Sequence, residues 1–588
     1  MAGARTFVVA DVDPVLAAPT VSVDPEARVR RTACLAAMVL AIIAPFEALR
    51  PLLTLPGQSL TTVEATLLAV MAMVGAALIA ARQWRWLDSN DLAAWSAFLV
   101  VAAIAAFTAP QFRSNAIHMT ARLATAFVVW GIVVIGGKTP GSRRSIATAV
   151  VVTAAFVSLL VIADFVNVPA IRSMLLAFRD GIAEVGGQVR ASGPFQYPTI
   201  TSMYLEIAFA LGLGLLVVQP HGANVTRTVV IASLALIFEG IVLTFTRSGL
   251  IAAWLSLAGV AVIHWRQRGV DKTAAALAVL AAVMAAELLS SHSMEMLTLR
   301  LTSEGQGQWF RAAIAAPSDL AFSTNQIQEV TVTLTNTGRA TWDSNADEPI
   351  RFTYHWMADD SDTVIAWEGI RTLFPAPVVS GETVTVRAQV RGPNRPGRFR
   401  LMWDLEQEHK RWFSTEPDAD FVVSRATVTG SFVATPAPDH RTPARLPQRT
   451  QRPGRGLLWG AALRMWLERP WLGVGPDNFR LLYGRFASVA VADPRVHSNN
   501  MYIEILAGMG IAGVATMAWL GLRLLRGALA AIRADGLGLG VAAACAACAV
   551  HGLADSFLTF TGTYILMAIV AGLACAYRSD GVGHAHRI

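Results

Sequence analysis

The feature that most constrains this chain is a series of apolar windows of about 20 residues, the length that an α-helix needs to cross a hydrocarbon layer of ~30 Å. Counting these windows predicts twelve spans. They lie near residues 33–50, 60–81, 91–110, 119–137, 145–167, 198–218, 228–245, 249–265, 273–290, 500–522, 537–553 and 555–576. Because backbone polar groups must be paired inside lipid, we expect a polytopic bundle of α-helices.

Composition agrees with a membrane protein and excludes other classes. Charged residues make up 15% of the 588 residues, against about 25% in an average soluble domain. The net charge of +7 is spread over many short loops, which argues against a cytosolic enzyme, a disordered chain and a dedicated nucleic-acid binder. The four cysteines fall in apolar runs and predict no disulfide framework. Cys545 and Cys548 have redox-motif spacing, but a structural role is favoured.

The basic residues predict the orientation of the spans, since short loops rich in Lys and Arg stay in the cytoplasm. Seven basic segments fall on one side when both termini are placed in the cytoplasm. They contain Arg28, Arg30, Arg31, Arg82, Arg85, Lys138, Arg143, Arg144, Arg227, Arg266, Arg268, Lys272, Arg523, Arg526, Arg533 and Arg578. Residues 1–32 are then a cytoplasmic tail, and we expect no cleavable signal peptide in it.

A long segment on the predicted outer face follows a different pattern. Stretches such as QEVTVTLTNTG and ETVTVRAQV alternate apolar and polar residues between Gly, Pro and Asp turns, which is typical of β-strands. The segment NTGRATW is similar to immunoglobulin-like modules of bacterial surface proteins, although it has no cysteine pair. We expect an inserted all-β sandwich whose Trp356, Trp367 and Trp412 pack in its core, with sugar stacking by exposed rings as the alternative.

These patterns divide the rest of the chain around the insert. The expected parts are a first transmembrane part with nine spans at 33–307, the sandwich at 308–430, a Pro- and Arg-rich linker at 431–454, an outer loop at 455–499, and a second transmembrane part with three spans and a tail at 500–588. The outer loop begins with an amphipathic helix and then a Gly and Pro turn.

Four arginines on the predicted outer face are candidate ligands for phosphate groups: Arg190, Arg247, Arg300 and Arg455. A guanidinium group meets phosphate oxygens with two parallel donors and stays protonated at working pH. The alternative is that each arginine anchors its helix at the level of the lipid headgroups. Arg247 favours binding, because it ends one apolar span in a tight turn and the next span follows at once.

His497 lies just before the tenth predicted span, also on the outer side. An imidazole there can accept a hydroxyl proton near neutral pH. The neighbouring asparagines, with Gly510 and Gly513 downstream, make this segment more specific than a lone surface histidine. The predicted substrate-binding residues of this part of the chain are Asn499, Asn500 and Tyr483.

Together these segments resemble the O-antigen ligase and polysaccharide polymerase superfamily. The resemblance rests on GPFQYPTITSMYL, LTFTRSG, RPWLGVGPDNF and HSNNMYIEILAGMGIAG, and it covers nearly all the chain outside the insert. It implies a glycosyltransferase of the GT-C type in a bacterial plasma membrane, without a metal or other cofactor. It also implies a donor glycan on a polyprenyl diphosphate, an acceptor hydroxyl of a glycan, lipid or cell wall, and no nucleic-acid partner. Ligases and polymerases share these motifs and differ in the acceptor.

The resemblance also implies roles for single residues. Arg190 and Arg247, helped by one of the other two arginines, hold the diphosphate and stabilise the leaving group. His497 orients or deprotonates the acceptor, whose attack opposite the lipid inverts the anomeric centre. The main family histidine falls at Asn499, and a second family histidine matches His497. Either His497 takes over the role of the base, or the protein relies mainly on electrophilic activation.

Two other classes of function stay open. Acidic residues within or near the ends of spans indicate a transporter or lipid flippase, since such groups can couple ions. They are Glu64, Asp164, Glu206, Glu239 and Glu287. Neither an inverted repeat nor a matching pair of broken helices supports that alternative. In the third class the sandwich performs the function and the spans only anchor it, although twelve spans exceed what an anchor needs.

Overall fold

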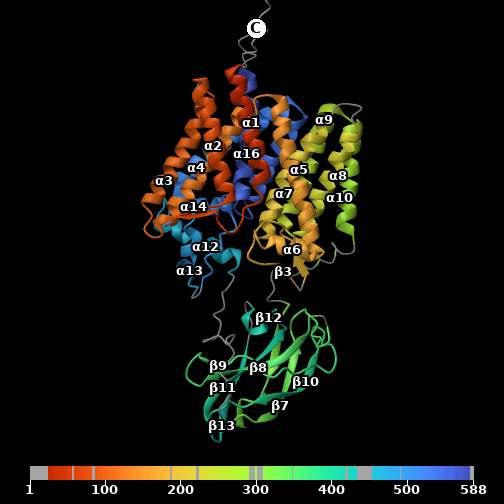
Figure 1. Cartoon of the computed structure of the whole chain (residues 1–588), viewed down its shortest axis with the longest axis vertical. Coiled ribbons are helices and arrows are strands. Elements are labelled where there is room, and N and C mark those ends of the chain that lie inside the picture. Colours follow the sequence, from red (N-terminus) through yellow and green to blue (C-terminus); the bar gives the residue numbers. More distant parts are fainter. Residues whose placement is uncertain are drawn as a thin grey trace, which may run out of the picture.

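The computed structural model consists of a bundle of apolar helices and a β-sandwich beyond one end of it (Figure 1). It describes residues 24–55, 58–82, 86–185, 188–219, 224–290, 294, 298, 300, 309–346, 348–408, 410–416, 421–432, 453–489 and 492–582. Most of the N-terminal tail predicted at 1–32 and of the linker predicted at 431–454 lies outside these residues, as does Arg85.

Ten helices among the described residues are long and apolar enough to cross a membrane. They are α2 (Thr62–Ala81), α3 (Ser89–Phe107), α4 (Arg113–Gly136), α5 (Pro140–Phe165), α7 (Pro198–Val217), α8 (Asn224–Leu243), α9 (Arg247–Arg268), α10 (Lys272–Leu289), α14 (Met501–Ala534) and α16 (Thr561–Val582). The prediction of a polytopic helical membrane protein is confirmed.

Two more helices stand where the first and eleventh spans were predicted. The first, α1 (Pro25–Ile43), begins with a charged turn that contains Glu26 and Arg28. The other, α15 (Gly536–His551), has only 16 residues. Neither meets the length and composition of the other ten, so the number of twelve spans stays a prediction. The tenth predicted span is also longer than expected, because α14 continues to Ala534.

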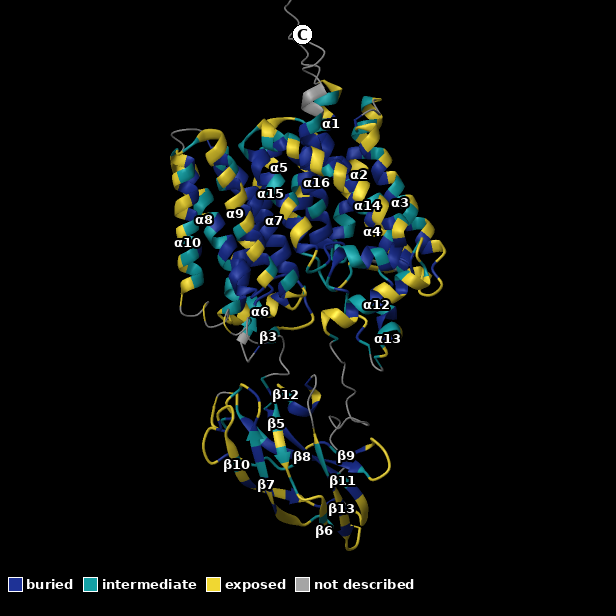
Figure 2. Ribbon diagram, turned by 180° about the vertical axis from the view of Figure 1, so that it is seen from behind, coloured by how far each residue is buried: buried dark blue, intermediate teal, exposed yellow. Residues whose placement is uncertain are grey.

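The helices differ strongly in how far they are buried. In α7, 94% of the apolar window is buried inside the bundle, whereas the value is 22% in α2 and 28% in α10. Figure 2 shows the same contrast, with buried residues in the middle of the bundle and exposed residues on its outer helices. Exposed apolar side chains on α2 and α10 suit contact with lipid, whereas α7 and α16, with 89% of the α16 window buried, are enclosed by protein.

Ion pairs gather several of the basic segments at one end of the bundle. Arg523 on α14 and Arg578 on α16 both contact the buried Asp91 near the start of α3. Arg143 near the start of α5 stacks on the ring of Tyr577, 4.1 Å from its centroid. These contacts place basic residues of three helices, α5, α14 and α16, on one side together with the start of α3, as the charge pattern requires. The assignment of that side to the cytoplasm stays a prediction.

The opposite end carries the short elements that face the sandwich (Figure 1). They are α6 (Pro169–Leu175), the hairpin of β3 (Ala183–Val185) and β4 (Gln188–Arg190), α12 (Arg455–Glu468) and α13 (Phe479–Ala487). A further hairpin, β1 (Leu53–Leu55) and β2 (Gln58–Leu60), joins α1 to α2. These elements interrupt the spans and bring polar residues to the surface of the bundle.

The sandwich has two sheets, one in the order β10-β7-β5 and one in the order β6-β13-β11-β8-β9, with β12 paired to β11. Its strands are β5 (Ala312–Ala315), β6 (Asp319–Ser323), β7 (Ile327–Asn336), β8 (Ile350–Ala358), β9 (Val364–Ala366), β10 (Thr383–Arg391), β11 (Gly397–Gln407), β12 (Arg411–Trp412) and β13 (Val422–Thr429). The pairs are antiparallel except β6 with β13. The immunoglobulin-like assignment stays a prediction.

The aromatic residues of the insert form its core. Trp356 and Trp367 are buried, as expected, while Trp412 is half-buried under Arg371. On the side that faces the bundle, Arg411 donates to Glu184 of β3 over 2.6 Å. This ion pair links the sandwich to the hairpin that also carries a predicted site residue, Arg190.

Candidate functional site

A buried ion pair positions the segment that carries Arg190. Both guanidinium NH groups of Arg179 donate to the carboxylate of Asp164 over 2.6 Å, and both side chains are fully buried. The same carboxylate accepts from the backbone N–H groups of Ser192 and Gly193. Because a buried bidentate pair of this kind is held in one geometry, it fixes the chain directly after Arg190 against α5.

The turn between α8 and α9 holds Arg190 from the other side. The Nε of Arg190 donates to the carbonyl of Thr244 over 3.0 Å, and one terminal NH group donates to the hydroxyl of Thr246. The backbone N–H of Ala191 donates to Leu243 at the end of α8. The motifs RASG and TFTRSG, more than 50 residues apart in the sequence, therefore form one surface.

Three of the four predicted arginines meet at this surface, and we call Arg190, Arg247 and Arg300 the cation cluster. Arg300 donates to the carbonyl of Phe245 over 3.3 Å, and Arg247 is the exposed first residue of α9. Burial, together with the charges of Arg300 and Arg247, lowers the pKa of Arg190 to about 9. Positive charges so close together repel one another, and a bound anion would relieve that repulsion.

The fourth predicted arginine occupies a neighbouring position. Arg455 is the first residue of α12 and donates to the carbonyl of Ala554 over 3.4 Å. Its charge acts on His551 at the end of α15. Arg455 is exposed, so it lies at the edge of the candidate site, next to the loop between α15 and α16.

A histidine and a glutamate that the sequence did not single out as a pair lie behind the cation cluster. Nδ1 of His551 is 2.7 Å from Oε2 of Glu206 on α7, and Nε2 is 2.9 Å from the hydroxyl of Ser248 on α9. The side chains of His551 and Glu206 are fully buried. This arrangement ties three helices together directly beneath Arg247.

His497 forms a second histidine–carboxylate pair. Its Nδ1 lies 2.7 Å from Oε1 of Glu504 in the first turn of α14, and the hydroxyl of Ser498 donates to the other carboxylate oxygen. Burial opposes protonation of the ring, but Glu504 and the more distant Asp477 and Asp555 outweigh it and raise the pKa of His497. A histidine tuned in this way can hold and release a proton near neutral pH.

Asp555, in the turn between α15 and α16, responds to both histidines. Burial raises the pKa of Asp555, while a hydrogen bond from the N–H of Ser556 and the charges of His551 and His497 act in the opposite direction. The two histidine–carboxylate pairs therefore belong to one electrostatic unit, with Asp555 as the group that both rings share.

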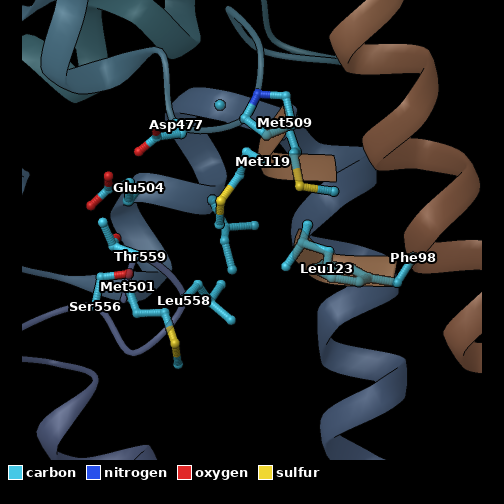
Figure 3. Close-up of a pocket in the computed structure, with 13 residues that line it drawn as sticks. Phe98, Met119, Leu123, Asp477, Met501, Glu504, Met509, Ser556, Leu558 and Thr559 are labelled. Atoms are coloured by element: carbon cyan, nitrogen blue, oxygen red, sulfur yellow. The ribbon is translucent and has the colours of Figure 1, made fainter. Parts of the chain in front are cut away.

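A pocket of about 30 Å³ adjoins the His497–Glu504 pair. One wall is apolar and includes Met119 and Leu123 of α4, while the other carries the carboxylates of Asp477 and Glu504 (Figure 3). A space of this size suits a water molecule or a hydroxyl group. Because Glu504 contacts both the pocket and His497, a hydroxyl there would lie next to the histidine pair.

The spacing of Asp477, His497 and Glu504 would also allow a metal ion, since one ligand atom from each lies within 4.8 Å of the others. Other groups of the protein already form hydrogen bonds with these ligand atoms. Asp477 accepts from Arg480 over 2.9 Å and from Asn115 over 3.1 Å, and the other two residues bond each other. The side chains of Asp477, His497 and Glu504 therefore already form hydrogen bonds within the protein, which suits a group that holds a proton.

The glycines downstream of His497 have a backbone role. Gly510 has φ 63°, which kinks α14, and a Cβ there would lie 2.4 Å from the carbonyl carbon of Trp471. The N–H of Ile511 donates to the carbonyl of Pro470 across this contact. The segment RPWLGVGPDNF thus packs on the kink, which explains why two sequence motifs distant in the chain belong together.

A family model described as O-antigen ligase matches residues 432–518. This range contains α12, α13, the His497–Glu504 pair and the kink at Gly510. Over this range the chain is similar to the O-antigen ligase family. No curated protein matches the chain. An O-antigen ligase-like or polymerase-like function in a membrane, with glycosyltransferase-like activity, follows from the family match and the helical bundle.

The matched range contains only part of the candidate site. The cation cluster lies outside it, as do Ser248, Glu206 and His551. Their geometry alone supports a functional role for those residues. Of these, only the arginines were predicted as ligands from the sequence.

Two predicted substrate-binding residues have structural tasks. Asn500 is the N-cap of α14: its side-chain oxygen accepts from the N–H groups of Tyr502 and Ile503, and its amide donates to Leu553. Tyr483 is fully buried, and its hydroxyl accepts from the N–H of Asp493. Tyr483 therefore packs α13 against its neighbours, and its role in substrate binding stays a prediction.

Asn499 stands where the main family histidine falls, and its backbone has φ 53°. Asparagine adopts this left-handed conformation more readily than most residues. The conformation turns the chain between His497 and the N-cap of α14. This backbone conformation explains why an asparagine suits position 499. This leaves His497, with its carboxylate partner Glu504, as the base that the local geometry favours.

The residues that sequence reasoning missed had one usable signal. His551 ends an otherwise apolar run, and an ionisable residue at the end of a span is a functional candidate. Glu206 was noted only as evidence for a transporter. Nothing in the sequence joins the two, because they are 345 residues apart.

Proposed function

We propose that the protein is a membrane glycosyltransferase that moves a glycan from a polyprenyl diphosphate carrier to an acceptor hydroxyl on the outer face. The observation that carries this proposal is the cation cluster beside a histidine–carboxylate pair at one end of the bundle. The match to the O-antigen ligase family supports it. The donor, the acceptor and the mechanism are our inference from the chemistry of these residues.

The cation cluster suits a diphosphate leaving group. Guanidinium groups meet phosphate oxygens with paired, charge-assisted hydrogen bonds. Arg247 is exposed, while Arg190 is half-buried and already anchored to Thr244. Arg190 is thus held in place before the donor binds, and charge stabilisation by positioned groups costs no reorganisation during the reaction.

The His497–Glu504 pair suits the acceptor. In the proposed step the acceptor oxygen forms a bond to C1 of the donor sugar as the bond from C1 to the diphosphate oxygen breaks. The diphosphate keeps the electron pair, and His497 takes the hydroxyl proton. The ring must be neutral to do so, and Glu504 then stabilises the imidazolium that forms. Attack opposite the diphosphate inverts the anomeric centre.

We propose that this reaction needs no divalent metal, because the arginines supply the positive charge that a metal would otherwise provide. The site then faces the outside of a bacterial plasma membrane, and both termini lie in the cytoplasm. The positions of the basic segments favour this orientation. The sandwich lies beyond the same end as the site (Figure 1), and in this orientation it is outside the cell.

The acidic residues that suggested a transporter have other partners. Glu64 completes a capping box at the start of α2. Asp164 pairs with Arg179, and Glu206 with His551. Three of the five acidic residues therefore have structural or site roles, which weakens the argument for ion coupling.

The test is transfer by the purified full chain in lipid nanodiscs. A defined lipid-diphosphate glycan and candidate acceptor glycans are added, and the products are identified by mass and anomeric configuration, with and without EDTA. We expect an inverted product that EDTA leaves unchanged, and product formation by Arg247→Ala that is slower by about 10²- to 10³-fold. Arg485→Ala is the matched control, because Arg485 is an exposed arginine paired with Glu468 on the same side. Vesicle assays that show movement of the intact donor lipid, without a new glycosidic bond, would contradict the proposal.

A further inference from the structure

The turn between α8 and α9 carries a hydroxyl group that two fully buried side chains hold in place. Ser248 contacts Nε2 of His551 at 2.9 Å, and Nδ1 of the same ring lies 2.7 Å from Glu206. Each of the three residues comes from a different helix. The proposed transfer step uses none of them, and they lie outside the range that matches the ligase family.

The groups around His551 favour one direction for the Ser248 hydroxyl. An ionised carboxylate only accepts, so Nδ1 of His551 carries a proton that it donates to Glu206. Burial of the ring and the exposed Arg455 oppose its protonation, whereas the carboxyl groups of Glu206 and Asp555 favour it and outweigh them. This balance favours the doubly protonated imidazolium, whose Nε2–H donates to the Ser248 oxygen. The hydroxyl proton of Ser248 then points to a different acceptor.

The surroundings of Ser248 indicate an anion as that acceptor. Ser248 follows Arg247 directly and lies in the first turn of α9. The hydroxyl of Thr246, the N-cap, donates to the carbonyl of Thr244 and does not cap the helix. The first backbone N–H groups of α9 therefore face the turn without a side-chain cap, and the positive end of the helix favours a negative group there.

Gly249 shows that the turn is built around this contact. A Cβ at this position would lie 1.8 Å from the hydroxyl oxygen of Ser202 and 3.2 Å from the carboxylate of Glu206. Any larger residue would push α9 away from α7 and separate Ser248 from His551. The motif Arg-Ser-Gly thus supplies a cation, a hydroxyl donor and the close approach that orients the donor.

We propose that Ser248 is a further ligand of the diphosphate, whose oxygen accepts the Ser248 hydroxyl proton next to Arg247, with His551 and Glu206 as positioning residues. The identity of the ligand rests on the proposed function. The hydrogen bond strengthens as negative charge develops on the leaving group, so it acts on the donor side of the reaction. His497 acts on the acceptor side.

The test compares Ser248→Ala, which removes the hydroxyl, with Ser248→Thr, which keeps it. Ser233→Ala is the control, because Ser233 is an exposed serine on α8 whose hydroxyl donates to its own helix at Val229. Binding of farnesyl diphosphate and farnesyl monophosphate is measured by calorimetry on the full chain in nanodiscs. Transfer kinetics with the lipid-linked glycan are measured in parallel.

We expect Ser248→Ala to weaken farnesyl diphosphate binding by on the order of 10-fold or more, since a hydrogen bond to a charged group is lost. Monophosphate binding should change less, acceptor KM should stay the same, and Ser248→Thr should restore diphosphate binding. A purely structural role would not produce this pattern.

Equal farnesyl diphosphate binding by Ser248→Ala and the unchanged protein would overturn the inference and leave the proposed function intact. Loss of binding that Ser248→Thr does not restore would also overturn it. A protein that binds neither farnesyl compound and transfers no glycan would remove the proposed function and, with it, the ligand assigned here.

Discussion

His497–Glu504 and His551–Glu206 are both histidine–carboxylate pairs in which Nδ1 lies 2.7 Å from a carboxylate oxygen. The first joins residues seven positions apart, on a loop and the first turn of a helix. The second joins two helices across 345 positions and is fully buried. The same chemical unit is thus present once in a local, partly accessible form and once as part of the helical core.

Because the two pairs differ in accessibility, they are suited to different tasks. A pair next to a pocket can exchange its proton with a substrate, so His497 is placed to act directly on the acceptor. A pair without solvent access keeps its protons and orients a third group, here Ser248. We therefore expect changes at the first pair to affect mainly the chemistry, and changes at the second to affect both donor binding and folding.

The largest effect is expected from His497→Ala. Loss of a general base lowers kcat by roughly 10²- to 10⁴-fold, while the affinity for farnesyl diphosphate should stay the same because the cation cluster is intact. The measurement is single-turnover transfer with the lipid-linked glycan. His118→Ala is the control, since His118 is an exposed histidine on α4. Full activity of His497→Ala would show that His497 is not the base.

Arg247→Ala should lower kcat/KM for the donor by about 10²- to 10³-fold, because one positioned charge no longer stabilises the leaving group. In contrast to His497→Ala, it should also weaken farnesyl diphosphate binding. The two variants together test whether the donor and acceptor sides are separate. If both changed only kcat, the division between the two pairs would be wrong.

Glu206→Gln should destabilise the protein, by about 3–5 kcal/mol, because it breaks a buried pair and leaves His551 without its carboxylate. Glu504→Gln should lower the free energy of unfolding by less, since the His497–Glu504 pair lies at the edge of a pocket. Thermal unfolding of both variants in the same nanodiscs measures the difference. Equal melting temperatures would contradict the contrast in burial on which the comparison rests.

The smallest effect is a shift in pH dependence. Glu504 helps to raise the pKa of His497, so the neutral, base-competent ring accumulates only as the pH rises through that raised value. Glu504→Gln removes one source of the increase and should move the acidic limb of kcat/KM to lower pH. The basic limb should fall near the pKa of Arg190, about 9, in both proteins. An unmoved acidic limb would assign it to another group.

The sequence predicts the helical spans well, because windows of about 20 apolar residues have few alternatives to membrane helices. It also predicts that the arginines of the cation cluster are candidate ligands. A charged residue in a tight turn between two spans, such as Arg247, is costly to place and is therefore a functional candidate. The count of spans is harder, because α15 is short and α1 begins with charged residues. α15 is as apolar as the spans but shorter, whereas the charged first turn of α1 makes its composition intermediate between a span and a surface helix.

The sequence does not predict which polar residues meet. Asn500 looked like a ligand because it follows His497, yet an asparagine directly before an apolar run is also a helix N-cap. Tyr483 lies in the predicted outer loop and was predicted to bind substrate, but it is fully buried where α13 packs. The contact of His551 with Glu206 depends on how α15 packs against α7, and local spacing carries no information about that.

The most direct test of the central claim is an experimental structure of the protein with farnesyl diphosphate bound. The account predicts diphosphate density between the guanidinium groups of Arg190, Arg247 and Arg300, at hydrogen-bonding distances of about 2.7–2.9 Å. Density at the opposite end of the bundle, near Arg523 and Arg578, or density that leaves the cation cluster without contact, would contradict it.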